Sequence, residues 1–208
     1  MICRPNTQDF DTLTEIREYA ALDIRPGDVC LDLGANCGAW TLTAVESATA
    51  LVVAVEPDPE NFKALCLNTD DSPHAIKRIN AAVARCREMI PFNRSQLSTC
   101  HTSRPAVIGP IGQIEVVAVT LPDLIREYGP TVIKCDIEGG EHNLDWDCLE
   151  NVRELAMEVH WFMEGDILSA TGLISVIEAQ GFKPLHDPSV MRPPNPERCH
   201  VQVGVWKR

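Results

Sequence analysis

The chain has 208 residues, of which 45% are hydrophobic and 23% charged, a composition typical of one globular domain rather than a collagen-like or disordered chain. Its formal net charge is -12, from 18 basic and 30 acidic residues. That balance argues against binding a polyanion over the whole surface, because neutralising phosphates needs clustered Lys and Arg. No apolar run approaches the ~20 residues of a membrane-spanning helix.

The amino-terminal residues MICRPNT lack the basic-then-apolar build of a secretory signal, so we expect a cytoplasmic protein. The nine cysteines would then stay mostly thiols. Their number is odd, no two are spaced as CxxC, and the histidines form no HxH or HxxxH pair. We therefore expect neither a disulfide framework nor a structural metal.

Helical and strand patterns alternate along the chain. An amphipathic segment at 7–22 ends at a Pro-Gly-Asp turn, and residues 1–27 are predicted to pack as a helical segment on a single domain spanning 28–208. Helices are predicted at 38–47, 59–68, 121–128, 141–149 and 170–180. Strands are predicted at 29–33, 50–55, 74–79, 131–136, 154–159, 182–186 and 199–206.

Short, nearly continuous apolar strands separated by helices indicate an α/β fold whose parallel sheet is covered on both faces. The stretch 81–119 interrupts this alternation with three prolines and several Ser and Thr, and it ends in the apolar run IEVVAV. We interpret it as an inserted loop or hairpin plus a short strand. Residues 81–112 of this stretch, together with the proline-rich loop at 187–198, are predicted to shape a substrate pocket.

The first dense motif is LDLGANCGAW, a strand that runs into Gly34 and Gly38 and then into a helix. Glycines at the carboxyl end of such a strand let a cofactor approach the backbone. The motif is not the dinucleotide fingerprint GxGxxG, because Asn36 occupies the second glycine position. Asp32 would repel a pyrophosphate but suits a sulfonium or ammonium group, which points to S-adenosylmethionine (SAM).

The second strand of the predicted unit ends in VVAVEPDP, with Glu56 placed 22 positions after Gly34. An acid there can accept both ribose hydroxyls of a nucleoside. The third strand ends at Asn80 and Ala81, which could border the adenine or simply close the strand through a turn. Ala35, Pro57 and, from a later strand end, Asp136 complete the predicted cofactor-binding set.

A second dense motif, IKCDIEGGEH, delivers Asp136 to the end of a buried strand and adds two further acids at once. Methyl transfer from a sulfonium is an in-line displacement, so the protein mainly aligns the acceptor and helps remove its proton. Asp136, Glu138 or Glu141 could do either. Glu141 could instead have no role in the reaction and simply stabilise the amino terminus of a helix. Burying the charge of Asp136 costs free energy unless a partner or the reaction itself compensates for it.

The following strand ends in MEVHW, where a period of two places Glu158 and His160 on one face. Because this strand is expected beside that of Asp136, the two residues can complete an acceptor pocket. His160 is a candidate base or orienting group, although a histidine at a strand end can also be purely structural.

The five blocks LDLGANCGAWTL, VVAVEPDPENFKAL, TLPDLI, IKCDIEGGEHNL and MEVHW together resemble the FkbM family of SAM-dependent methyltransferases over roughly residues 29–207. The fourth block is the most specific. The resemblance implies a Rossmann-like sheet of seven strands with an antiparallel last strand, and O-methylation of a hydroxyl on a sugar or small secondary metabolite. It implies that the cofactor is held by Asp32, Gly34, Asn36, Gly38 and Glu56, and that the reaction site is lined by Asp136, Glu138 and Glu141.

Nucleic acid is disfavoured as the acceptor, because residues 136–139 replace the (D/N)PPY motif of base methylation and the chain has no Pro-Cys dipeptide. Three alternatives remain open: a magnesium-assisted O-methyltransferase, since clustered carboxylates bind Mg²⁺; an NAD-dependent oxidoreductase; and a non-catalytic cofactor-binding protein. Residues 77–104 carry a local charge of +5, which predicts contact with a small anionic acceptor unless it is only a solvated surface.

Overall fold

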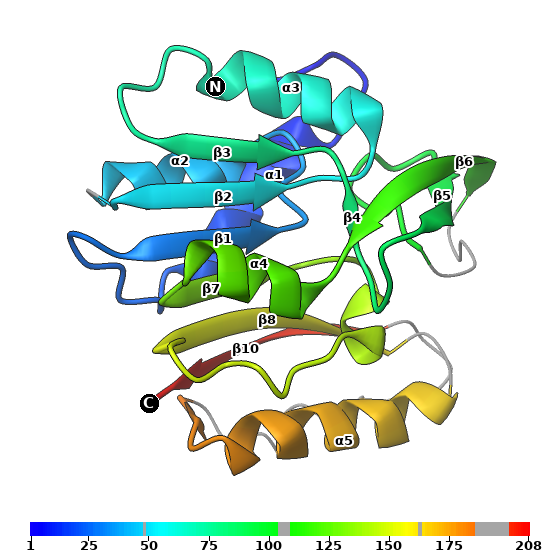
Figure 1. The fold of residues 1–208 in the computed structure, drawn as a ribbon. Helices are drawn as coiled ribbons and strands as arrows, with labels where there is room; N and C mark the ends of the chain where they lie inside the picture. The colour runs from blue at the N-terminus through cyan, green and yellow to red at the C-terminus, as the bar shows by residue number, and fades with distance from the viewer. Residues whose placement is uncertain (48, 104–108, 162–163, 186–199) are drawn as a thin grey trace.

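The computed structural model describes residues 1–47, 49–103, 109–161, 164–185 and 200–208. A seven-stranded sheet forms its centre, in the order β3-β2-β1-β7-β8-β10-β9 (Figure 1). Its strands are parallel except that β10 runs antiparallel to β8 and β9, so the predicted fold class is confirmed. The strands are β1 (Val29–Leu33), β2 (Leu51–Val55), β3 (Ile76–Ile79), β7 (Val132–Cys135), β8 (Glu154–Trp161), β9 (Lys183–Pro184) and β10 (His200–Lys207).

Helices cover both faces of the sheet, because alternate residues of each central strand point to opposite sides. Leu31 and Leu33 pack in the cluster that includes α4 and α5, whereas Cys30 packs with η1 and α2 on the other side. Burial of both faces explains why these strands are almost wholly apolar. The helices are α1 (Asp9–Glu15), α2 (Ala39–Glu46), α3 (Pro59–Thr69), α4 (Leu121–Tyr128) and α5 (Glu164–Ala179), with 3-10 turns η1 (Ile16–Tyr19) and η2 (Gly140–Asn143).

Residues 82–119 form a second, three-stranded sheet in the order β4-β6-β5. Strands β5 (Met89–Ser95) and β6 (Pro110–Val119) pair antiparallel as a hairpin, and β4 (Ala82–Val83) joins β6 in parallel. Figure 1 shows this unit projecting beyond the carboxyl ends of β1, β2 and β3. Residues 98–103, between β5 and β6, therefore reach the edge of the sheet where ligands bind in open α/β folds.

Two helix boundaries differ from the sequence prediction. The helix predicted at 141–149 is only the short turn η2, because the Trp146 indole donates to the carbonyl of Glu141 (2.9 Å), an acceptor that a continuing helix would need. Helix α5 begins at Glu164, earlier than predicted. The predicted pocket loop at 187–198 lies outside the described residues. Within the described part of the chain, no helix has the length and apolar character needed to cross a membrane.

Candidate active site

A cavity of about 280 Å³ opens at the carboxyl ends of β1, β2, β7 and β8. It lies where the strand order reverses, since β1 is flanked by β2 on one side and β7 on the other. Four residues of α1 and η1, namely Thr12, Glu15, Ile16 and Tyr19, line it, as do residues 98–103 of the β5–β6 connection. The cavity is thus built by four strand ends and two covering segments.

The loop after β1 brings its backbone into the cavity wall. Gly34 has φ +78°, and a Cβ built on it would lie 1.7 Å from the carbonyl oxygen of Asp136, so this position requires glycine. Asn36 is also left-handed (φ +49°), a conformation that Asn tolerates, and it lines the cavity with Ala35. Gly38 (φ +91°) does not line the cavity; its missing Cβ leaves room for Leu65 of α3.

Glu56 closes β2 and is only 4% exposed. One carboxylate oxygen accepts the backbone N–H of Asn36 and the other accepts that of Asp58, both at 2.9 Å. Burial raises the pKa of Glu56 to about 7, although these two hydrogen bonds partly oppose the shift. Because each carboxylate oxygen accepts two hydrogen bonds, Glu56 keeps acceptor capacity for a ligand in the cavity that it lines with Pro57.

The residues predicted after β3 have different positions. Ala81 is buried and lines the cavity. Asn80 does not, because its amide donates to the carbonyls of Glu56 (2.8 Å) and Pro57 (3.1 Å) and so ties the ends of β2 and β3 together. Of the two roles that the sequence left open for Asn80, its contacts therefore agree with the structural one, at the end of the strand, rather than with a place beside the adenine.

The structure does not bring Asp32 to the cavity. Its carboxylate is fully buried, accepts a hydrogen bond from Thr41 (2.6 Å) and lies 3.4 Å from the ammonium of Lys134. Lys134 is the direct neighbour of Asp32 across β1 and β7, so the sheet register makes the pair. Its ammonium also donates to the carbonyl of Gly34 (2.9 Å) and lies 3.5 Å from Asp136. The carboxylate of Asp32, which was expected to attract a cationic cofactor, therefore pairs with Lys134 instead.

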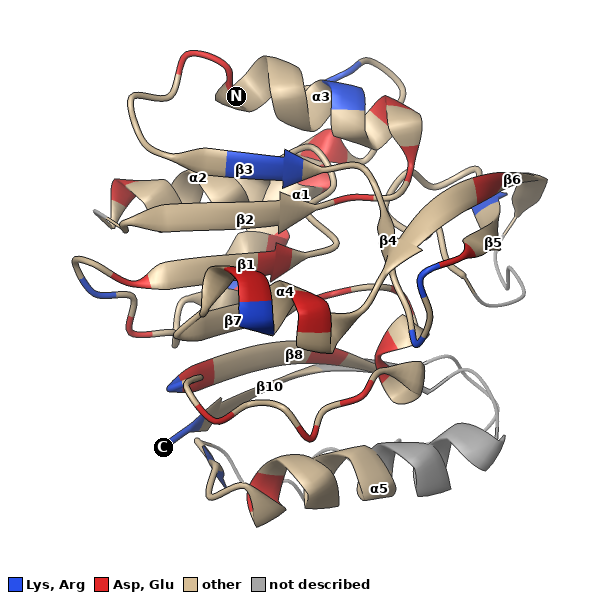
Figure 2. Ribbon diagram, in the orientation of Figure 1, with Lys and Arg blue, Asp and Glu red and all other residues tan. Residues whose placement is uncertain are grey.

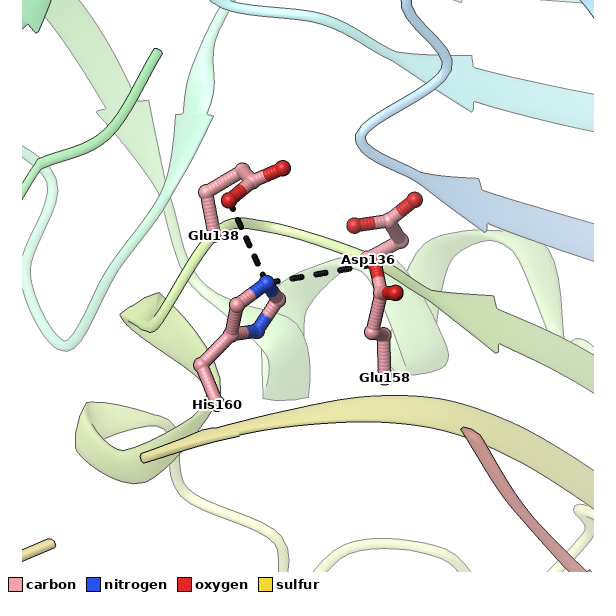
Figure 3. A group of neighbouring side chains, drawn as sticks. All are labelled: Asp136, Glu138, Glu158 and His160. Atoms are coloured by element: carbon pink, nitrogen blue, oxygen red, sulfur yellow. Dashed lines mark ion pairs between the residues drawn. The ribbon is translucent and has the colours of Figure 1, made fainter. Parts of the chain in front are cut away.

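Four predicted site residues do converge: Asp136, Glu138, Glu158 and His160 each offer a ligand atom within 4.8 Å of the others (Figure 3). Nε2 of His160 lies 3.2 Å from Glu138 and 3.9 Å from Glu158. The parallel pairing of β7 with β8 explains this convergence, because both strands end at the same edge. Among the described residues this is the set that could hold a divalent cation.

Glu138 reaches the cluster through a backbone conformation that glutamate rarely adopts, with φ +54°. The hydroxyl of Thr102 donates to its carbonyl oxygen (2.6 Å), which fixes the loop after β7 against the loop of the hairpin. Strained backbone of this kind is concentrated at functional sites and is held by surrounding contacts.

Burial and mutual proximity set the charges of the cluster. Burial and the neighbouring Asp136 raise the pKa of Glu158, so Glu158 is protonated and bonds to Asp136. Although burial alone would raise the pKa of Asp136, Lys134 and that hydrogen bond lower it, so Asp136 is ionised. Burial disfavours a charged His160, but Glu138 and Glu141 raise its pKa well above the ordinary value, so it is an imidazolium.

Glu141 stands behind the cluster and does not line the cavity. It is fully buried, and its Oε1 accepts the backbone N–H of His160 (2.8 Å) and lies 3.2 Å from Nδ1 of the same residue. This carboxylate therefore orients the imidazole so that Nε2 faces the cavity. Neither of the roles considered for Glu141 from the sequence included this contact.

The described basic residues of the stretch 77–104 do not gather at the cavity, and Arg104 lies outside the described residues. Arg94 pairs with the buried Asp58 (2.7 Å), and Arg87 pairs with Asp123 at the start of α4. Figure 2 shows that acidic residues, including those on the neighbouring helix α4, lie among the Lys and Arg of this region. Neither Arg87 nor Arg94 lines the cavity. The geometry therefore does not support the predicted contact of this stretch with an anionic acceptor.

Sequence reasoning missed Lys134 and Tyr19, both of which line the cavity. Lys134 carried a usable signal, because a lysine inside an otherwise apolar strand must be paired. Residues 98–103 line the cavity and lie within the inserted stretch that was predicted to shape a pocket, although the sequence did not single out any one of them.

Comparison with known proteins places these features in one family. Residues 32–184 match the family described as the methyltransferase FkbM domain. The hexuronic acid methyltransferase AglP of Haloferax volcanii is 28% identical over 141 residues, which cover 64% of this chain and 56% of that protein. The chain thus spans little more than half the length of AglP. The 31-O-demethyl-FK506 methyltransferase FkbM of Streptomyces tacrolimicus is 28% identical over 202 residues, covering 77% of this chain and 75% of that protein.

Solved structures support the same fold. A putative S-adenosylmethionine-dependent methyltransferase from Listeria monocytogenes aligns with a TM-score of 0.53 at 10% identity, covering 95% of this chain and 99% of that one. A precorrin-6y C5,15-methyltransferase from Geobacter metallireducens aligns with a TM-score of 0.50 at 9% identity, covering 99% and 90%. At such identities the likeness establishes the fold alone.

Proposed function

Because the chain belongs to the FkbM methyltransferase family, we propose that it transfers the methyl group of SAM to a hydroxyl of a sugar or small metabolite. One observation carries this proposal: a single cavity has an acceptor for ribose hydroxyls, Glu56, at one strand end and an ionised carboxylate, Asp136, at another. The names of two relatives, which concern a hexuronic acid and a demethylated hydroxyl compound, agree with a hydroxyl acceptor.

On this proposal the cofactor lies along the ends of β1 and β2. Glu56 accepts the ribose hydroxyls, while Gly34, Ala35 and Asn36 offer the close backbone surface and Pro57 and Ala81 border the base. The missing Cβ of Gly34 keeps the loop after β1 against the carbonyl of Asp136, which draws the cofactor site and the acid cluster together. When bound, SAM supplies the electrophilic methyl group and the positive sulfonium.

The residues of this chain then align the acceptor and take its proton. The acceptor oxygen attacks the methyl carbon as the carbon–sulfur bond breaks, giving an O-methyl product and S-adenosylhomocysteine (SAH). The hydroxyl proton passes to Asp136, the ionised carboxylate of the cluster, as positive charge develops on the oxygen. His160 carries its protons in the resting state, so it holds Glu138 through Nε2 rather than acting as the base.

The proposal is tested by binding and turnover together. We expect calorimetry to detect binding of SAM and SAH and none of NAD, since Asn36 disrupts the dinucleotide motif. Methyl-labelled SAM should then label at least one hydroxylated acceptor in a panel of sugars, glycolipids and small metabolites. Tight NAD binding without SAM binding would contradict the proposal, as would SAM-dependent labelling confined to amines or carbon atoms.

A magnesium-assisted reaction is a second candidate, favoured by the four converging groups. The contacts of the cluster argue against it, because both imidazole nitrogens of His160 already face carboxylates and Asp136 lies beside an ammonium. We therefore expect turnover to be unchanged after treatment with EDTA and unaffected by added Mg²⁺ or Mn²⁺. Loss of turnover in EDTA that Mg²⁺ restores would favour the metal-assisted mechanism instead.

A further inference from the structure

Tyr19 contacts the reaction site from outside the part of the chain that matches the family. It ends η1, ahead of the matched residues 32–184, and is 5% exposed at the wall of the cavity. Its phenol hydroxyl donates to Oδ2 of Asp136 at 3.2 Å. Burial, followed by the negative charge of Asp136, raises the pKa of Tyr19 well above its ordinary value, so the phenol stays protonated and remains a donor.

The ring of Tyr19 also meets the cation of the site. Nζ of Lys134 lies 5.4 Å from the centre of the ring, within the range of a cation–π contact, and 3.5 Å from the same Asp136 oxygen. Tyr19 and Lys134 therefore approach Asp136 Oδ2 together, one with a hydrogen bond and one with a charge. Glu158 contacts Asp136 as well, so Asp136 is held by groups from three separate elements: η1, β7 and β8.

The segment that carries Tyr19 is fixed at both ends. Upstream, the backbone N–H of Gln8 donates to the Ser98 hydroxyl (3.2 Å) and its side-chain oxygen accepts the Ser98 N–H (2.7 Å). Downstream, the N–H of Asp23 donates to the buried carboxylate of Glu154 (2.7 Å). These contacts make the approach of Tyr19 to Asp136 a property of the packed fold rather than of a loose terminus.

We propose that Tyr19 is a positioning residue for methyl transfer, holding the Asp136 carboxylate in the orientation in which it receives the acceptor's proton. This inference rests on the proposed function, since it assigns Tyr19 a role in that reaction. Tyr19 and Lys134 engage Oδ2 of Asp136 and Glu158 bonds to the same carboxylate, which keeps further capacity to accept the acceptor hydroxyl because each of its oxygens accepts two hydrogen bonds. A displacement of a reacting group by about 1 Å can lower the rate by about 100-fold, so a hydrogen bond that fixes Asp136 has direct kinetic value.

The test is Tyr19→Phe, which keeps the ring and its contact with Lys134 but removes the hydroxyl. We expect kcat to fall by about ten-fold or more, the effect of losing a hydrogen bond to a charged group, while the KM for the acceptor and the Kd for SAM change by less than about two-fold. The matched control is Tyr128→Phe, which removes the hydroxyl of the chain's other tyrosine, at the end of α4 and outside the cavity. It should leave kcat unchanged.

Unfolding free energies add a readout that needs no turnover. If the hydroxyl acts on Asp136, the stability lost in Tyr19→Phe should shrink when Asp136→Asn is already present, because the two residues share one contact. Wild-type kcat retained in Tyr19→Phe would overturn the inference, and so would equal losses in kcat and SAM affinity, which indicate cofactor binding. Failure of the proposed function is separate: the wild-type protein itself would then methylate no hydroxyl.

Discussion

Replacing Asp136 with Asn is expected to lower methyl transfer by about 100-fold or more while the protein still folds and binds SAH. The reason is the loss of the carboxylate of the cluster whose pKa is lowered, so that it is ionised at neutral pH. Lys134 and the hydrogen bond from Glu158 lower the pKa of Asp136, whereas the pKa values of Glu138 and Glu158 are both raised, chiefly by burial. An amide in its place can still accept the hydrogen bond from Tyr19 but takes no proton.

The substitution should be tolerated structurally. Lys134 keeps two other partners, the carboxylate of Asp32 and the carbonyl of Gly34, so no ammonium is left buried without a counter-group. The matched control is Asp147→Asn, an exposed aspartate in the connection between η2 and β8 that lies outside the cavity. It should retain wild-type turnover.

Comparing SAM with SAH separates two roles of Asp136. The two ligands differ by the methyl group and its positive charge, so a carboxylate that only takes the proton leaves their affinity ratio unchanged in Asp136→Asn. A carboxylate that also attracts the sulfonium weakens SAM relative to SAH, the role that the sequence assigned to Asp32. Calorimetry with both ligands, alongside initial rates with labelled SAM, measures the difference. Unchanged turnover in the variant would mean that the reaction site has been misassigned.

Affinity for SAM is expected to fall by about ten-fold between about pH 7 and about pH 5.5, and Glu56→Gln should remove this dependence. Burial raises the pKa of Glu56 to about 7, so most of the carboxylate is protonated at the lower pH. A neutral carboxyl offers fewer acceptor sites to ribose hydroxyls than a carboxylate. Below pH 7 the α-amino group of the ligand, with a pKa near ~8, stays protonated and does not contribute.

The same raised pKa has a consequence for the unliganded protein. Glu56 has a higher pKa in the folded chain than in the unfolded one, so the folded state binds more protons between about pH 4.5 and about pH 7. The contribution of Glu56 to stability is therefore lost as the pH rises through that window. On the proposed function, we expect cofactor binding to oppose this loss, because ribose hydroxyls would stabilise the ionised form of Glu56.

The measurement is calorimetric titration of SAM at both pH values, with Glu60→Gln as the matched control. Glu60 is an exposed glutamate in the first turn of α3, four residues from Glu56, and its replacement should leave the pH dependence intact. The Glu56→Gln variant should bind SAM more weakly at both values, since one amide end must face a backbone N–H of Asn36 or Asp58. A pH dependence that persists in Glu56→Gln would assign it to another group, such as the acid cluster.

Most of the fold could be predicted from the sequence because its signals are local. An apolar strand that runs into glycine or an acid, followed by helical periodicity, recurs three times, and the strands of the central sheet were predicted to within two residues. The wrong predictions also have physical causes. The helix predicted at 141–149 stops at Asn143 because the Trp146 indole takes the carbonyl of Glu141, a contact that periodicity cannot reveal.

The candidate site, too, has features that the sequence predicts and features that depend on tertiary contacts. That Glu56, Asp136, Glu158 and His160 share one cavity follows from their positions at the ends of neighbouring parallel strands, which the sequence supports. The fate of Asp32 does not follow, because it depends on β7 lying beside β1 in the register that sets Lys134 opposite it. Gly38 and Asn80 likewise make structural contacts instead of lining the cavity: Gly38 lies against Leu65, and Asn80 donates to the carbonyl of Glu56.

By itself, then, the sequence determined the α/β class, the family and the strand ends at which chemistry occurs, since periodicity and strand-end residues are properties of short stretches of chain. Only the tertiary structure decided which of those residues face the cavity and in what charge state. Lys134 neutralises Asp32, Glu141 orients His160 from behind, and Tyr19 reaches Asp136 across 117 positions of sequence. Those contacts join segments far apart in the chain, and the burial that shifts their pKa values exists only once the segments pack.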